Sequence, residues 1–154
     1  MIRHSNIYGP HDKFDLEKSH VLGATITKIM KANEEIEIWG KGNEVRDFLY
    51  ISDLLNFVKL IIQKQKSSFK IYNCGSGKGI KILDLVKLIA DISNKKIKIK
   101  KNTSAPNIRF NLLLDSTKAN NELGWKPMVD LDNGIRKTIF WWKRFISRKI
   151  RLIF

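Results

Sequence analysis

Apolar residues in this 154-residue sequence change their spacing repeatedly, and this alternation is the feature that most restricts the fold. Stretches with helical spacing are separated by short segments in which charged and apolar residues alternate, as they do from Glu35 to Trp39 (EIEIW). No repeat occurs, and no internal linker is long enough to divide two domains. We therefore expect a single domain of mixed α/β order.

Turn and capping residues set the ends of the expected elements. Expected strands cover residues 2–7, 35–39, 45–51, 69–73 and 97–101. Expected helices cover residues 20–32, 54–62, 82–92, 116–123 and 131–146. A glycine turn at residues 40–43 joins two of the strands, and Gly124 ends a helix. We expect Ser52 and Asp53 to cap the second helix, whose spacing indicates a broad buried face, and Asp115 to cap the fourth.

The charge of the chain is strongly positive. It contains 29 Lys+Arg and 15 Asp+Glu, which gives a formal net charge of +14. Nucleic acid, an anionic membrane or an anionic small molecule would each suit such a charge. Much of the excess lies in residues 94–101 (NKKIKIKK) and 141–151 (WWKRFISRKIR) rather than along one recognition helix. We interpret it as a lysine-rich, solvated surface.

Cysteine usage and hydropathy exclude several classes of protein. The single cysteine, Cys74, rules out an internal disulfide and leaves no spaced set of metal ligands, so we expect no metal site. Because Cys74 lies at the end of an expected strand, we expect it to be packed rather than to act as a nucleophile. Neither a run of about 18 apolar residues nor a signal-peptide pattern occurs, which predicts a cytoplasmic protein.

Four motifs follow one another along the chain. They are residues 3–10 (RHSNIYGP), 39–53 (WGKGNEVRDFLYISD), 73–77 (NCGSG) and 115–127 (DSTKANNELGWKP). In this order they resemble the NAD-dependent epimerase/dehydratase family, the extended short-chain dehydrogenases. Residues 9–21 (GPHDKFDLEKSHV) are most similar to the GDP-L-fucose synthases and their GDP-sugar relatives. The resemblance implies that residues 1–154 form the C-terminal, substrate-binding domain of such an enzyme, which closes over a nucleotide sugar.

The same resemblance implies roles for individual residues. His20 matches a histidine implicated in proton transfer during epimerisation, and a group that titrates near neutrality suits that work. Arg46 matches an arginine whose planar fork binds diphosphate oxygens, although a cross-strand ion pair is its alternative. The other implied substrate contacts are Lys28, Trp39 and Arg109, and the implied cofactor contacts are His4, Ser5, Asn6 and Ile7. Core packing is an equal alternative for Trp39, and a solvated helix face is the alternative for Lys28.

Two motifs of the family do not occur in this sequence, the glycine-rich G-x-x-G-x-x-G and the catalytic Y-x-x-x-K. We therefore expect the N-terminal Rossmann half, which would bind NADP or NAD, to be missing and the chain to be inactive alone, as a truncated or split gene product. A separate chain or a homodimer partner would supply that half. Residues 1–8 would be a remnant strand of it, without partner strands.

Three functions are therefore open. The first is a GDP-sugar epimerase/reductase that binds a nucleotide sugar and neither nucleic acid nor membrane. The second is a nucleotide-sugar-binding module without catalysis. The third is a basic nucleic-acid or membrane-surface binder, which would use residues 94–101 and the C-terminal aromatic residues Trp141, Trp142 and Phe145 as an apolar anchor.

Overall fold

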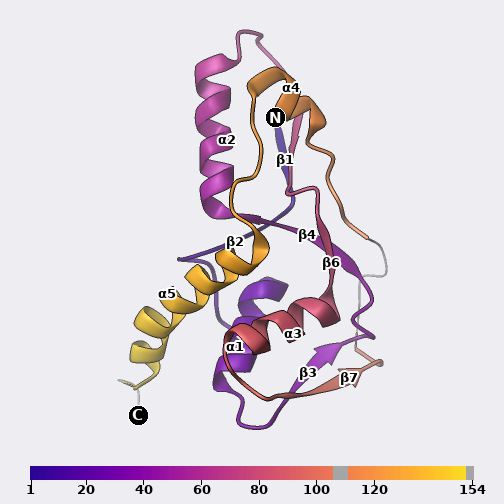
Figure 1. Cartoon of the computed structure of the whole chain (residues 1–154), viewed down its shortest axis with the longest axis vertical. Helices are drawn as coiled ribbons and strands as arrows, with labels where there is room; N and C mark the ends of the chain where they lie inside the picture. Colours follow the sequence, from indigo (N-terminus) through magenta and orange to yellow (C-terminus); the bar gives the residue numbers. More distant parts are fainter. Residues whose placement is uncertain (106–110, 152–154) are drawn as a thin grey trace.

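The computed structural model describes residues 1–105 and 111–151 (Figure 1). The seven strands in the described part are β1 (Ile2–His4), β2 (Asn6–Tyr8), β3 (Glu35–Trp39), β4 (Val45–Tyr50), β5 (Tyr72–Cys74), β6 (Gly79–Lys81) and β7 (Lys98–Asn102). The five helices there are α1 (Val21–Lys31), α2 (Ile51–Lys64), α3 (Ile82–Ile92), α4 (Thr117–Leu123) and α5 (Leu131–Arg151). The expected mixed α/β order is confirmed.

The strands form three small sheets. β1 pairs with β5 and β3 with β7, in both cases parallel, while β4 lies between β2, which is parallel to it, and β6, which is antiparallel. The strands expected over residues 35–39 and 45–51 both form, but they belong to different sheets and do not pair with each other. β6 was not expected, because three residues are too few to show an alternation.

The expectation that residues 1–8 lack partner strands is wrong. The segment divides at Ser5, whose backbone N–H donates to the Cys74 carbonyl at 3.0 Å. On one side of this break β1 pairs with β5, and on the other side β2 pairs with β4. The break lets one short segment complete two sheets.

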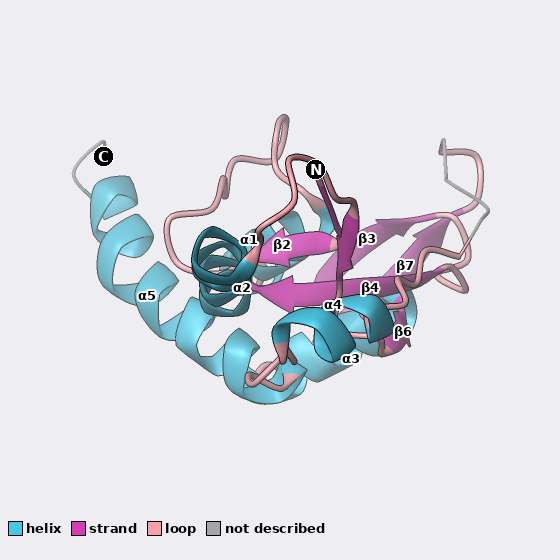
Figure 2. Ribbon diagram, turned by 90° about the horizontal axis from the view of Figure 1, so that it is seen from above, coloured by secondary structure: helices cyan, strands magenta, loops and turns pink. Residues whose placement is uncertain are grey.

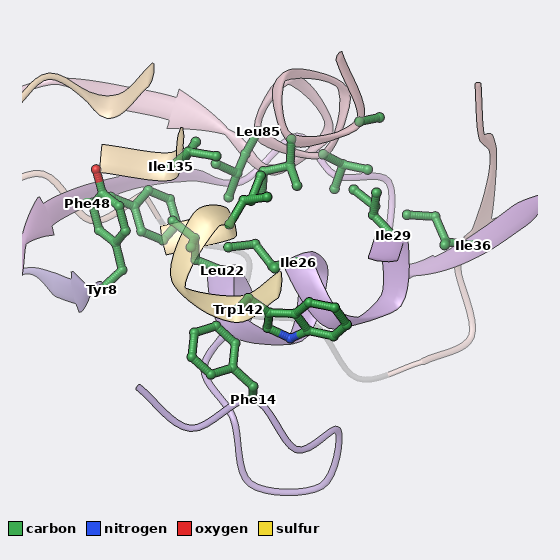
Figure 3. Packing of buried hydrophobic residues seen from close by; sticks show 14 of the residues in the cluster. Tyr8, Phe14, Leu22, Ile26, Ile29, Ile36, Phe48, Leu85, Ile135 and Trp142 are labelled. Carbon is green, nitrogen blue, oxygen red and sulfur yellow. The ribbon is translucent and has the colours of Figure 1, made fainter. Parts of the chain in front are cut away.

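Two apolar clusters hold the elements together. The larger contains Leu22, Ile26 and Ile29 of α1, Leu85 and Ile89 of α3, and Ile135 and Trp142 of α5 (Figure 3). The smaller surrounds Trp125, which is fully buried and whose indole N–H donates to the Asp53 carbonyl at 3.1 Å. Figure 1 shows α2, α4 and β1, which contribute to the smaller cluster, at the upper end, and α1 and α3, which contribute to the larger one, below them.

Strand β4 contributes side chains to both apolar clusters. Phe48 and Tyr50 belong to the larger cluster, and Leu49 between them belongs to the smaller one. This division follows from the alternation of side chains along a strand, which sends neighbouring residues to opposite faces. The two clusters are therefore the two sides of one strand.

Helix α2 is less buried than its apolar spacing predicts. Only Asp53 and Phe57 are buried, whereas Leu55 is 62% and Ile62 is 78% exposed. The helix packs on β2, β4 and α4, and these cover one narrow side of it. The prediction of a broad buried face is wrong, because the three-stranded sheet next to α2 is too small to cover that face.

The two acidic capping predictions have different outcomes. Asp115 Oδ1 accepts bonds from the Thr117 hydroxyl at 2.6 Å and from the Thr117 N–H at the start of α4 at 2.8 Å, as expected. The hydroxyl bond and then the N–H bond lower the Asp115 pKa. The Asp53 carboxylate instead accepts from the backbone N–H groups of Met128 and Val129, at 3.1 and 3.0 Å. No side chain caps α2, so that prediction is wrong. Asp53 fastens the segment before α5 to α2.

The C-terminal aromatic residues are mostly occupied within the fold. Trp142 is buried and donates to Thr27 Oγ1 at 3.2 Å, and Trp141 stacks on Phe14 with ring centroids 5.6 Å apart. Of the expected apolar anchor, only Phe145 is exposed.

Among the helices of the described residues, none is both long and apolar enough to cross a membrane. Figure 2 shows α5 as a long helix along one side of the molecule.

Asp47 connects three separate segments through one buried carboxylate. Its side chain accepts bonds from the backbone N–H groups of Ser76, Gly77 and Leu114, at 2.9, 3.3 and 3.4 Å, and from the Ser76 hydroxyl. A Cβ atom at Gly75 would lie 2.4 Å from Asp47 Oδ2, so only glycine fits there. Asp47 is fully buried, and these amides would be unpaired without it.

We predict that Asp47→Asn lowers the free energy of unfolding by about 2–4 kcal/mol, because an amide cannot accept all of these bonds and has lost the charge that strengthens them. Urea unfolding followed by circular dichroism measures the change. Asp91→Asn, at an exposed position of α3, is the matched control and should change the value by less than about 0.5 kcal/mol. Equal stability of Asp47→Asn and the unchanged chain would contradict the assignment.

Cys74 is packed, as expected. It is fully buried in the smaller cluster, and burial, together with the negative charges of Asp53 and Asp47, raises its pKa to about 12.

We predict that the Cys74 thiol stays protonated at pH 8 and reacts with a disulfide reagent only when the chain unfolds. The labelling rate should rise with urea along the unfolding curve. Rapid labelling of the native chain without urea would show that the thiol is accessible.

Candidate functional site

A cavity of 630 Å³ lies between α1, β3 and β4 and is bordered by the segment that precedes α1. Five of the nine residues singled out in the sequence line it: Asn6, His20, Lys28, Trp39 and Arg46. They come from β2, the start of α1, the body of α1, β3 and β4. Residues that are 40 positions apart in the chain, Asn6 and Arg46, thus face the same space.

The other four residues lie elsewhere or cannot be placed. His4 is exposed on β1, where its Nδ1 lies 2.8 Å from the Ser5 carbonyl oxygen. Ser5 is buried, and its Oγ has no hydrogen-bond partner among the described residues. Ile7 packs against the smaller apolar cluster. Arg109 lies outside the described residues.

His20 is the residue that immediately precedes α1. Its backbone is extended, with φ −70° and ψ 163°, and its imidazole makes no capping bond to the helix. The side chain is exposed at the cavity rim. An imidazole that the helix does not use as a cap is available to exchange protons with a bound molecule.

Lys28 and Arg46 bring two cations to the cavity from different elements. Lys28 lies two turns beyond His20 on α1, and its Nζ donates to the Glu37 carbonyl at 3.0 Å. Arg46 is half-buried on β4, where its Nη1 donates to the Val45 carbonyl at 3.2 Å. Both contacts to main-chain carbonyls restrict the side chains without neutralising their charge. Lys28 and Arg46 are therefore the groups in this cavity that can contact an anionic part of a ligand.

Trp39 lies at the end of β3 with 59% of its side chain exposed. The alternative that Trp39 belongs to the core is excluded, because β3 buries Ile36 and Ile38 and turns Glu35, Glu37 and Trp39 outward. An exposed indole at a cavity rim offers a flat apolar surface on which a ring can stack.

The sequence reasoning missed Glu37, which also lines the cavity. Its carboxylate Oε1 accepts a bond of 3.0 Å from Asn102 Nδ2 of β7. The signal was present in the alternation of residues 35–39, because Glu37 must share a face with Trp39 two positions later. The partner Asn102 was not predictable, since the register between β3 and β7 is set by the fold.

A second hollow, of 440 Å³, lies beside Ser76, Thr117, Asn120 and Lys126. Among the described residues, none that was expected to bind substrate or cofactor lines it. In the described part of the chain, no group of three or more His, Cys, Asp or Glu is placed to hold a metal ion. The cavity next to α1 is therefore the better candidate for a functional site.

Comparison with known proteins gives the sequence a family context. Residues 1–75 match the family described as NAD dependent epimerase/dehydratase. A probable GDP-L-fucose synthase of Oryza sativa subsp. japonica is 35% identical over 150 residues, which are 94% of this chain and 45% of that protein. A GDP-L-colitose synthase of Yersinia pseudotuberculosis is 38% identical over 137 residues, covering 86% of this chain and 44% of that protein. The chain thus spans less than half the length of these relatives.

The fold matches solved structures over a similar range. A UDP-glucose 4-epimerase from Thermotoga maritima, solved with UDP-glucose, superposes with a TM-score of 0.80 and 28% identity. The match covers 94% of this chain and 46% of that one. The expected likeness in sequence and fold, which covers one part of the longer relatives, is confirmed.

Proposed function

Because this chain belongs to the NAD-dependent epimerase/dehydratase family, we propose that its cavity binds a nucleotide sugar, and specifically a GDP-sugar, for epimerisation and reduction. The observation that carries the proposal is the meeting of His20, Lys28, Trp39 and Arg46 in one cavity. These residues come from three separate elements and the segment next to α1, and a nucleotide sugar offers each of them a chemically suitable group.

In the proposed complex, each side chain has a distinct task. Arg46 and Lys28 bind the diphosphate, Arg46 by two parallel hydrogen bonds and Lys28 as a point charge. The exposed indole of Trp39 packs against a flat face of the ligand. His20 moves a proton at the sugar carbon that changes configuration. A bound NADP or NAD would accept or donate the hydride of the redox step.

The described residues that were expected to contact the cofactor do not meet in one place. Of the four residues expected to contact the cofactor, only Asn6 faces the cavity, and its Nδ2 donates to the Asp47 carbonyl at 2.8 Å. We therefore propose that residues 1–154 are the substrate-binding part, with β1 and β2 at the border to a cofactor-binding part in a separate segment or chain. The exposed apolar residues Leu55 and Ile62 of α2 support this, because such a part would cover them.

We predict that this chain binds GDP and that Arg46→Lys weakens binding about 10-fold, because lysine keeps the charge but loses the planar fork. Isothermal titration calorimetry measures both constants. Lys31→Ala, at an exposed position in the last turn of α1 and outside the cavity, is the matched control and should bind as the unchanged chain does. Absence of GDP binding by the unchanged chain would contradict the proposal.

We predict that His20→Asn abolishes proton exchange while leaving GDP binding intact. The His20→Asn variant would be mixed with NADPH, a GDP-sugar and a second protein that carries the G-x-x-G-x-x-G and Y-x-x-x-K motifs. NMR would follow the uptake of deuterium from the solvent into the sugar of the GDP-sugar. Loss of a positioned acid/base group should slow exchange by about 100- to 10,000-fold. Exchange at an unchanged rate in the variant would exclude His20.

The same mixture separates a second candidate function. In this second function the chain binds the nucleotide sugar but does not convert it, even when the cofactor-binding part is supplied. Binding without deuterium uptake would identify a nucleotide-sugar-binding module, which would use Lys28, Trp39 and Arg46 of the cavity.

A further inference from the structure

Three carboxylates line the cavity, those of Glu17, Glu37 and Glu44, and one of them is held in place beside the exposed indole. Glu37 and Trp39 project from the same face of β3, two residues apart. Across the sheet, Trp39 is opposite Asn102 of β7, and the Asn102 amide reaches diagonally to Glu37 Oε1. No second donor lies against Glu37 within the described residues, so Asn102 orients the carboxylate and leaves it acceptor capacity.

Lys28, one of the two residues proposed to bind the diphosphate, lies next to Glu37. Lys28 extends from α1 to β3, where its Nζ donates to the Glu37 main-chain carbonyl. Its ammonium group and the Glu37 carboxylate therefore lie near each other in the cavity lining. A ligand whose phosphates contact Lys28 and Arg46 can extend its base along β3 toward Trp39. The base would then have one face on the indole and one edge at the carboxylate.

A carboxylate selects strongly among bases, because it can only accept hydrogen bonds. Guanine has two adjacent donors on its Watson–Crick edge, the N1–H and the 2-amino group, which match the two oxygens of a carboxylate. Uracil and thymine place a carbonyl on each side of their single N–H, and these carbonyls would repel it. Hydrogen bonds to an ionised acceptor are stronger than neutral ones, which favours the match with guanine.

We infer that Glu37, positioned by Asn102 and beside Trp39, is the residue that selects a guanine nucleotide over a uracil or thymine nucleotide in this cavity. The inference rests on the proposed function, since it assumes that a nucleotide sugar occupies the cavity. It goes further by assigning base selection to one side chain and its support.

The test uses three nucleotides and three variants of the chain. Calorimetry would give dissociation constants for GDP, UDP and inosine diphosphate, which retains N1–H but lacks the 2-amino group. For the unchanged chain we expect GDP to bind about 10- to 100-fold more tightly than UDP and about 10-fold more tightly than inosine diphosphate. In Glu37→Gln the advantage of GDP over inosine diphosphate should disappear, and UDP should bind more tightly because its carbonyls no longer face a negative charge.

The other two variants test whether Asn102 positions the Glu37 carboxylate, and whether the loss of any negative charge on β3 has the same effect. Asn102→Ala should lose part of the preference for GDP, because the carboxylate is then less fixed. Glu35→Gln is the matched control, since Glu35 is on the same face of β3, pairs with Lys100 at 2.6 Å and does not line the cavity. It should keep the full preference. Circular dichroism would check that each variant is folded.

The outcomes separate the two proposals. Equal binding of GDP and UDP by the unchanged chain, or an unaltered preference in Glu37→Gln, overturns the role of Glu37 and leaves nucleotide-sugar binding in place. If the unchanged chain binds none of the three nucleotides, both proposals fail. Loss of the preference in Glu37→Gln together with its retention in Glu35→Gln supports the inference.

Discussion

The buried carboxylate of Asp47 is the interaction on which the arrangement of this chain most depends. It gathers the amides of the glycine turn after β5 and of the segment before α4, and its own main chain bonds to Asn6 and to Leu112. The next residue toward the N-terminus is Arg46, which faces the cavity. Asp47 therefore holds the surrounding segments together, and the adjacent Arg46 places a cation at the cavity. The precision of the candidate site follows from that anchor.

The sequence was informative about elements and less so about their partners. All five expected helices form, because their apolar spacing extends over several turns, and Gly124 ends α4 in the left-handed conformation, with φ 69°. The pairing of β3 with β7 and of β1 with β5 was not foreseen, since short strands carry no mark of their neighbours. Asp53 was misassigned for a related reason. An acidic residue near a helix start looks like a cap, and its actual partners are 75 and 76 positions away.

The candidate site shows the same limit. The resemblance brought His20, Lys28, Trp39 and Arg46 to attention, and the fold places all four around one cavity. Ile7 shares the motif of Asn6 but turns away from that cavity, because neighbouring residues of a strand point in opposite directions. His4 does not line it either, because the chain breaks at Ser5 and His4 belongs to β1, in another sheet. Some of the lysines that make the chain basic stabilise the fold, which the net charge alone does not reveal. Lys95 donates to the carbonyls of Met30 and Ala32 at the end of α1, and Lys64 to that of Leu123 at the end of α4. Lysines at these positions satisfy carbonyls that the helices leave open.

Strand β4 separates the two apolar clusters and contributes to both. Since Phe48 and Tyr50 pack in one cluster and Leu49 in the other, β4 cannot leave without exposing both. The free energies of the two clusters are therefore coupled, and partially folded forms that keep only one of them are scarce. The molecule should melt as one cooperative unit, although its apolar residues are divided between two cores.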